Sequence, residues 1–168
     1  MLLLETFNSQ NQELRMLLES LPEKILFNKP KPEKWSIAEI VEHLNISDKG
    51  AYLALLKQGE IPTDEEKEAS IQLIRSVLSG SNGAWIAPEV ALPTGRYQDK
   101  SMLIADFFKL RTRLEKQFEN WNPEHLAIGL GHPRLGFMTQ KQWLEFLNWH
   151  TLHHFKQIQG IVEQNRGY

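Results

Sequence analysis

Residues 139–164 read TQKQWLEFLNWHTLHHFKQIQGIVEQ and form the longest helical pattern in the chain. Apolar residues recur there at spacings of three and four, which indicates one buried face of an α-helix. Thr139 and Gln142 have the spacing of a capping box at the helix start. Within the apolar face, His150 and His154 stand four residues apart. Four helical residues turn through about 400° and rise about 6 Å, so both imidazoles lie on that face.

The same periodicity predicts three more long helices and one shorter helix. The long helices are expected near residues 3–20, 36–57 and 101–119, and the shorter one near 64–79. The stretches between them that are rich in Gly and Pro are expected to be loops, at residues 80–100 and 122–136. No alternation of apolar and polar residues indicates a sheet. We therefore predict an all-α single domain, residues 1–168, folded as a four-helix bundle with an additional short helix in a long crossover connection.

Three further helix starts have identifiable caps. Ser36 with Glu39, and Thr63 with Glu66, have the capping-box spacing. Ser101 is the expected N-cap of the helix that follows it. The connection between the second and third long helices exceeds 40 residues. Such a length permits a crossover between parallel neighbours, so the bundle need not alternate up and down.

Composition restricts the chemistry. The 168 residues contain no cysteine, which excludes disulfides, thiolate metal sites and a cysteine nucleophile. Lys plus Arg number 19 and Asp plus Glu 21, a balance that argues against general nucleic-acid binding. The first residues lack the basic start of a signal peptide, and no apolar run reaches the about 20 residues needed to cross a bilayer. We expect a cytoplasmic protein with no membrane partner.

The six histidines permit two interpretations. His150 and His154 have the spacing of a metal-binding pair, or they are core histidines bonded to carbonyls or carboxylates. A third ligand would come from another helix, and His43 is the natural candidate; the alternative is a partly exposed histidine. His153 is expected at the edge of the buried face. Two more are expected to be exposed loop histidines, with lining an opening as the alternative: His125 and His132.

Two motifs resemble signatures of the DinB/YfiT-like superfamily. Residues 35–44, WSIAEIVEHL, resemble its W-S-x-x-E-hydrophobic-x-x-H-L signature. Residues 149–158, WHTLHHFKQI, resemble its H-x-x-H-H-x-x-Q-I signature. Residues 132–136, HPRLG, and residues 143–147, WLEFL, are similar to a loop and helix start common in one branch. The resemblance implies a four-helix bundle holding a divalent metal, commonly zinc or nickel. It assigns the metal ligands by motif position: His43, His150 and His154.

Three imidazole ligands leave a coordination position open, as in catalytic zinc sites. Such a metal lowers the pKa of bound water or binds a thiol as thiolate. The resemblance implies a metal-dependent hydrolase or a small-thiol transferase, as in mycothiol-dependent maleylpyruvate isomerase, acting on a small molecule and often dimeric. Since the chain has no cysteine, any thiol must come from a cofactor or substrate. The alternative is a non-catalytic stress-response or binding bundle with structural or vestigial histidines.

No general base can be named from the sequence. Glu42 is expected on a solvated helix face, with a role as base the alternative, and Asp48 is also near His43. Ser47 would bond a metal-bound water or simply pack. Asn148 and Gln157 flank the ligand face, so each is either a partner of a ligand or a surface residue. Tyr52 and Arg96 are further candidates for which the sequence offers no specific argument. Of the tryptophans, Trp35 and Trp143 are expected in structural roles, and two in loops are candidates for a substrate pocket: Trp85 and Trp121.

Overall fold

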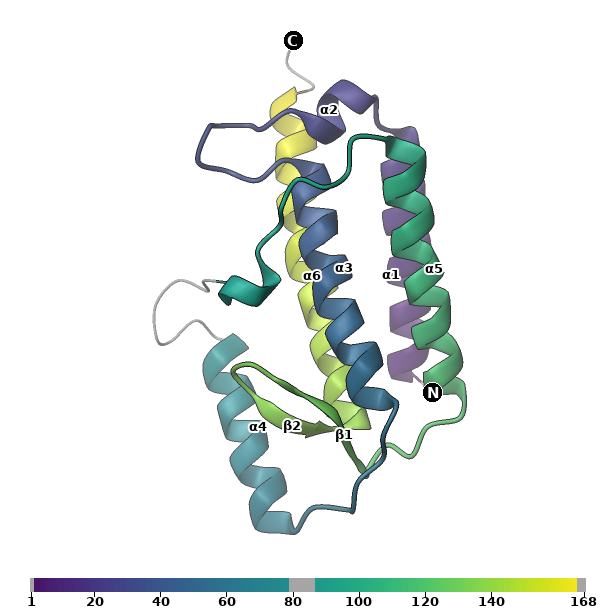
Figure 1. Ribbon diagram of the computed structural model, residues 1–168, viewed down its shortest axis with the longest axis vertical. Coiled ribbons are helices and arrows are strands. Elements are labelled where there is room, and N and C mark those ends of the chain that lie inside the picture. The colour runs from purple at the N-terminus through teal and green to yellow at the C-terminus, as the bar shows by residue number, and fades with distance from the viewer. Residues whose placement is uncertain (1, 79–86, 166–168) are drawn as a thin grey trace.

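The computed structural model describes residues 2–78 and 87–165. Four long helices pack as a bundle: α1 (Leu2–Ser20), α3 (Ile37–Leu55), α5 (Lys100–Glu119) and α6 (Gln140–Asn165). Figure 1 shows the four helices side by side along the long axis of the molecule. The prediction of a four-helix bundle is confirmed, and each predicted long helix agrees with the structure to within a few residues.

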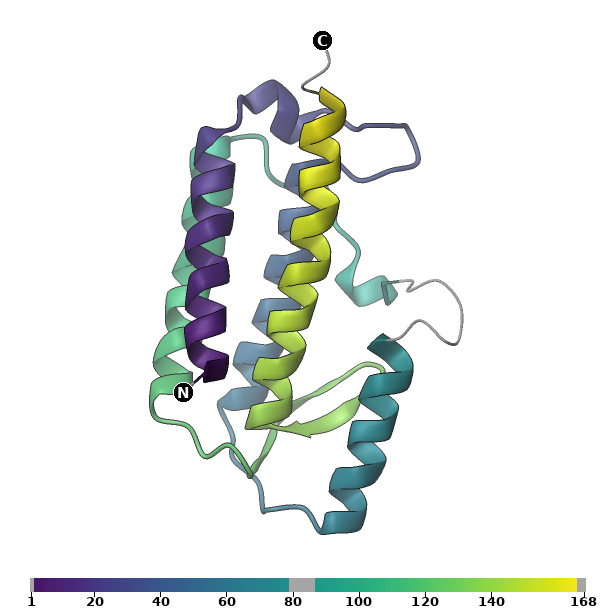
Figure 2. The same ribbon diagram turned by 180° about the vertical axis from the view of Figure 1, so that it is seen from behind.

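The bundle does not alternate up and down. Helices α1 and α6 run in one direction while α3 and α5 run in the other, as Figures 1 and 2 show from opposite sides. Helix α3 packs on α5 and α6, and α1 packs on the same two helices. The neighbours α3 and α5 are therefore parallel. The crossover between them carries the predicted short helix, α4 (Asp64–Leu78), and a single 3-10 turn, η1 (Glu89–Ala91).

A β-hairpin occupies most of residues 122–136, which were expected to form a loop. Strand β1 (Leu126–His132) pairs antiparallel with β2 (Gly136–Thr139), so the expectation of no sheet is wrong here. The beginning of β1 bonds to the segment after α3: Ile128 N–H donates to the Lys57 carbonyl and Gly59 N–H to the Leu126 carbonyl, both at 2.8 Å. These long-range bonds supply the stability that the short strands lack.

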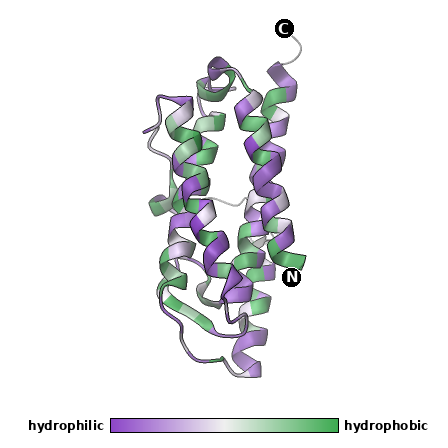
Figure 3. Ribbon diagram, turned by 90° about the vertical axis from the view of Figure 1, so that its right-hand side faces the viewer, coloured by the Kyte–Doolittle hydropathy of each residue, from purple (hydrophilic) through white to green (hydrophobic). Residues whose placement is uncertain are grey.

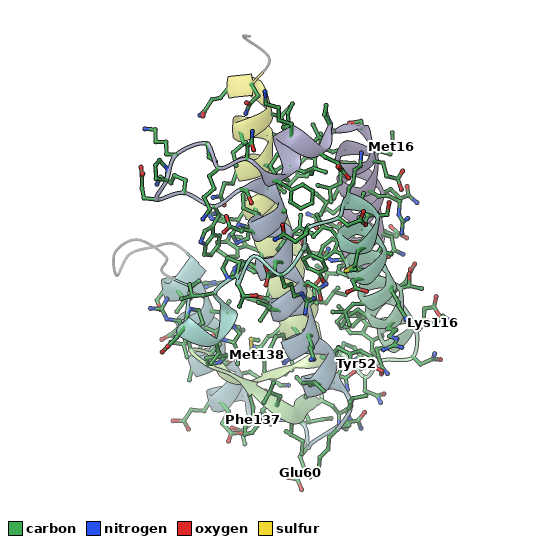
Figure 4. The ribbon with its side chains drawn as sticks, turned by 45° about the horizontal axis from the view of Figure 1, so that its top comes forward. Met16, Tyr52, Glu60, Lys116, Phe137 and Met138 are labelled. Atoms are coloured by element: carbon green, nitrogen blue, oxygen red, sulfur yellow. The ribbon has the colours of Figure 1, made fainter. Side chains whose placement is uncertain are left out.

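Glycine explains why the strand has no alternating pattern. A Cβ built on Gly129 would lie 2.1 Å from the Leu53 carbonyl oxygen, so only glycine fits this close approach to α3. In β2 the first two residues are exposed and the last two are buried: Phe137 is 55% exposed while its neighbour Met138 is buried, and both are labelled in Figure 4. The hairpin thereby closes the lower end of the bundle core.

The predicted capping boxes are present. In each, the side chains bond reciprocally with the backbone N–H groups, at Ser36 with Glu39, Thr63 with Glu66, and Thr139 with Gln142. The predicted Ser101 cap is wrong. Helix α5 begins two residues earlier, where the Asp99 carboxylate accepts the Met102 N–H at 2.7 Å, because a charged acceptor suits the positive helix end. The sequence pattern also missed the five-residue helix α2 (Glu23–Phe27).

The core contains two apolar clusters separated along the bundle by a buried polar layer. One cluster includes Leu18, Ile40 and Phe107, and the other includes Phe7 and Phe118. Buried polar side chains lie at the intervening positions of the helices: His43, Asp48, Arg111, His150, Thr151 and His154. Figure 3 shows hydrophobic and hydrophilic residues alternating along the helices, as expected for helices with one buried face. In the described part of the chain, no helix has the length and hydropathy to span a membrane.

Candidate metal site

Three histidines from two helices converge within the polar layer. His43 lies on α3, and His150 and His154 lie on α6. The His150 Nε2 atom is 3.0 Å from His43 Nε2 and 3.1 Å from His154 Nε2. All three residues are at most 4% exposed. The structure thus brings together the three residues that the motifs selected, and among the described residues they form the group whose donor atoms could share one ion.

Hydrogen bonds fix the orientation of two of these rings. His43 Nδ1 lies 2.7 Å from the Ala91 carbonyl oxygen, and His154 Nδ1 lies 2.9 Å from Gln157 Oε1. Since both partners are acceptors, each Nδ1 carries the proton and donates it. Each Nε2 therefore presents a lone pair toward the centre of the cluster. Acceptors held this close require a proton or a cation between them.

Stacking, rather than a hydrogen bond, orients the third ring. His150 stacks on Phe146 with ring centroids 5.2 Å apart and an interplanar angle of 18°. Its Nδ1 is buried and has no hydrogen-bond partner in the described part of the chain. Four tetrahedral ligands at zinc–nitrogen distances of 2.0–2.1 Å would be about 3.3 Å apart. The observed separations are a few tenths of an ångström shorter, so the rings need only a small outward movement to fit a metal.

Burial keeps the three imidazoles neutral. It lowers the pKa of His154 to about 3, with the nearby His43 ring adding to the effect. It also lowers the pKa of His150 well below its usual range, and that of His43, where the bond to Ala91 acts in the opposite direction. Neutral imidazole is the form that binds metals. The cluster is therefore in its ligand form at neutral pH without first losing protons.

Two cavities open on the cluster. One has a volume of about 420 Å³, and His43 and His150 lie on its wall. The rest of that wall is mostly apolar and includes side chains from α3, the 87–91 segment, the hairpin and α6: Leu53, Val90, Leu130, Trp143 and Phe146. The other opening, of about 540 Å³, is more polar and is lined by Trp35, His43, His153, His154, Lys156 and Gln157. The imidazole cluster therefore separates an apolar chamber from a polar one.

Glu42 does not lie on a solvated helix face, so that prediction is wrong. Its side chain is 1% exposed and accepts hydrogen bonds from Thr94, Gly95 and Arg96 at 2.7–3.2 Å. Burial by itself raises the pKa of Glu42, but these bonds outweigh it and hold the pKa below its usual range. The carboxylate thereby ties residues 94–96 to α3, close along the chain to the Ala91 carbonyl that orients His43.

The structure separates the other polar candidates. Gln157 is the partner of His154 described above, whereas Asn148 donates to the Leu3 carbonyl on α1. Ser47 lies on the wall of the apolar cavity. Asp48 forms an ion pair with Arg111, Oδ2 to Nε at 2.7 Å, and is thereby occupied away from the imidazole cluster. Two side chains line neither cavity: Tyr52 and Arg96.

Two of the loop histidines are not exposed as expected. His132 is half-buried and lines the apolar cavity, because its ring packs against Trp143 and Phe146 at centroid distances of 5.8 and 5.0 Å. His125 is also half-buried, with Nδ1 2.9 Å from the Gly59 carbonyl oxygen. His153 is exposed beside the cluster, as predicted.

The structure places three of the four tryptophans that the sequence singled out. Trp121, a pocket candidate, is half-buried, packs against the core residue Phe118 and lines neither cavity. Trp85 lies outside the described residues. Trp143 is buried, as predicted, and also contributes to the cavity wall. Trp35 packs on the His43 ring, with centroids 5.0 Å apart.

Known proteins are similar to this chain over most of its length, one in sequence and one in structure. The uncharacterized protein YuaE of Bacillus subtilis (strain 168) is 27% identical over 161 residues, covering 94% of this chain and 96% of that protein. The structure of YfiT from Bacillus subtilis, described as a probable metal-dependent hydrolase with an unusual four-helix bundle topology, superimposes with a TM-score of 0.62. It is 17% identical and covers 96% of this chain and 85% of its own. The model of the DinB superfamily matches residues 6–158, and the chain belongs to that superfamily.

Proposed function

We propose that the protein is a metal-dependent hydrolase whose divalent ion is bound by His43, His150 and His154. The observation that carries this proposal is the convergence of three buried Nε2 atoms, of which those of His43 and His154 present lone pairs. The similarity to YfiT adds support through its fold and its description as a probable metal-dependent hydrolase. Zinc or nickel is the proposed metal because both accept imidazole ligands.

The residues around the cluster have distinct tasks in this proposal. The Ala91 carbonyl and Gln157 hold two ligand rings in the tautomer that presents Nε2, which raises their basicity. A metal on three such ligands keeps a position open and, when bound, lowers the pKa of water toward neutrality. The apolar cavity receives a small-molecule substrate beside His43 and His150. Water has access from the polar opening on the His154 side.

Metal analysis tests the binding half of the proposal. Untagged protein purified without a nickel column is expected to contain one equivalent of metal per chain by plasma mass spectrometry. His150→Phe keeps the ring stacking and removes the ligand nitrogen, so its metal content should fall far below one equivalent. His153→Gln is the matched control, since it removes an exposed histidine of the same helix. Equal metal content in wild type and His150→Phe would overturn the site.

Turnover tests the catalytic half. The metal-loaded protein is expected to hydrolyse p-nitrophenyl esters, and both EDTA treatment and His150→Phe should abolish this activity. A parallel assay with glutathione- or bacillithiol-type thiols tests the related transfer reaction, which the same ion would support by binding the thiol as thiolate. Metal that raises the melting temperature without turnover in either assay would favour the non-catalytic bundle instead.

A further inference from the structure

The hairpin loop fixes the tautomer of His132. Its Nδ1 accepts two backbone N–H groups, from Arg134 and Leu135, each at 3.1 Å. A nitrogen that accepts cannot carry the proton of a neutral ring, so the proton lies on Nε2. Burial, together with the Arg134 charge, lowers the pKa of His132 to about 4, so the ring is neutral near pH 7. His132 therefore presents one N–H donor in a defined direction.

This ring belongs to the wall of the apolar cavity. It packs edge-on against Phe146 with centroids 5.0 Å apart, and Phe146 also stacks on the His150 ring at 5.2 Å. One aromatic ring thus links His132 with the imidazole cluster. In the described part of the chain His132 Nε2 has no hydrogen-bond acceptor, and the atom is accessible from outside the protein. Its N–H is available to a ligand.

Other polar groups on this wall are less suited to hold a ligand. The Trp143 Nε1 atom also lacks a partner in the described part of the chain, but it is fully buried and out of reach. Lys49 is exposed, so its ammonium is free to remain in water. Ser47 has a hydroxyl that rotates freely, whereas the His132 ring is held by two hydrogen bonds and two aromatic contacts. A donor fixed in advance loses little entropy on binding.

We propose that His132 Nε2–H donates a hydrogen bond to an oxygen atom of the substrate and so positions it in the apolar cavity beside the imidazole cluster. The substrate class that fits is an uncharged, mainly apolar small molecule with a carbonyl-type oxygen. The apolar wall favours the body of such a molecule, and His132 selects its single acceptor. This inference rests on the proposed function, since it names the substrate class of the same site.

Acetophenone and isopropylbenzene form a matched pair of probes, because they have similar shapes and only the ketone has an acceptor. Their dissociation constants are measured by ligand-observed NMR with EDTA-treated protein, so that a metal cannot bind the carbonyl. His132→Asn keeps an acceptor for the loop amides and loses the distal donor, whereas His132→Gln keeps a distal donor. The ketone-to-hydrocarbon ratio of dissociation constants should rise about 2–13-fold in His132→Asn, as expected for one hydrogen bond. It should stay near the wild-type value in His132→Gln.

Several outcomes would overturn this role. They are an unchanged ratio in His132→Asn, a rise in Ser47→Ala of the size expected for His132→Asn, and failure of both probes to bind wild type. Thermal melts of the variants confirm that the ratios come from folded protein. Metal analysis separates the two proposals. Equal metal content in wild type and His150→Phe would contradict the hydrolase, while an unchanged probe ratio in His132→Asn would contradict only the role of His132.

Discussion

Two polar networks lie in the same buried layer of the bundle, and only one of them is complete. Arg111 donates to Asp48 at 2.7 and 3.2 Å, to Asn11 at 2.7 Å and to Thr151 at 2.8 Å. None of these four side chains has a buried polar atom without a partner in the described residues. The neighbouring histidine cluster has three inward nitrogens, and at least two of them are acceptors.

The two networks differ in which helices they join and in whether they need a ligand. The Arg111 network joins all four long helices, since its members come from α1, α3, α5 and α6. Opposite charges and matched donors make it a stable unit without any ligand. The histidine cluster joins only α3 and α6, and in the proposed function a metal cation would complete it. We therefore expect the first network to determine stability and the second to determine metal binding, and each variant below tests that division.

The largest effect is expected when the complete network is broken. Arg111→Met leaves the Asp48 carboxylate buried without its partner, and burial already raises the pKa of that carboxyl against the opposing effect of Arg111. Loss of one member of a buried ion pair costs about 3–5 kcal/mol. Urea denaturation should show this loss in the free energy of unfolding, while the folded fraction retains its metal.

The control for this variant replaces both charges. Asp48→Leu combined with Arg111→Met removes the unpaired carboxylate, so the double variant should be more stable than Arg111→Met alone. If Arg111→Met loses less than about 1 kcal/mol, or loses its metal while remaining folded, then the two networks are not separate in function.

A smaller effect, confined to metal binding, is expected at Gln157. Its Oε1 orients the His154 ring from an exposed position, so Gln157→Ala should lower zinc affinity by about 10–100-fold, the usual effect of removing an outer partner. The stability of the metal-free protein should change by less than about 0.5 kcal/mol, as for other surface substitutions. A competition titration with a chromophoric zinc chelator measures the affinity.

Gln157→Glu is the matched control for this position. The carboxylate still accepts the His154 Nδ1–H and makes the ring more basic, so zinc affinity should equal or exceed that of wild type. Equal affinities for wild type, Gln157→Ala and Gln157→Glu would show that the bond has no effect on the ligand ring.

The sequence predicted what depends on local periodicity. The capping boxes and the His150–His154 face follow from spacings of three and four, which any buried helix must obey. His43 was the natural candidate for a third ligand from another helix, but only the motif resemblance assigned it that role, because nothing in its local spacing says which helix faces α6. The hairpin could not be predicted in this way, since β1 is held by backbone bonds to the segment after α3 and by the space that Gly129 leaves there.

The surroundings of the site depended on long-range contacts that leave little trace in the sequence. Glu42 appeared to belong to a solvated face because its partners are backbone N–H groups some fifty positions away. The Ala91 carbonyl that orients His43 is a main-chain atom, which no residue type reveals. His132 belongs to the loop motif of residues 132–136, but its place on the cavity wall follows from its contacts with two aromatic rings of α6.

The smallest effect concerns pH and a residue that combines features of both networks. His132 has one nitrogen satisfied, like Arg111, and one left open, like the histidine cluster. Burial, aided by the Arg134 charge, lowers its pKa to about 4 in the folded protein, against about 6.5 for an unfolded histidine. Between these values the unfolded state binds more protons, so the free energy of unfolding falls as the pH falls from about 6.5 to 4 and is unaffected by this group above that range.

Asparagine does not titrate, so metal-free wild type should lose more stability than metal-free His132→Asn between pH 7 and pH 4. Because the ring is partly exposed, the difference should be less than the about 1.4 kcal/mol per pH unit of a fully buried histidine. Urea denaturation at several pH values measures both proteins, and the contributions of the titratable groups that the two proteins share cancel in the difference. Parallel pH profiles would mean that His132 is solvated in the folded state, and its Nε2–H would then be bound to water rather than reserved for a ligand.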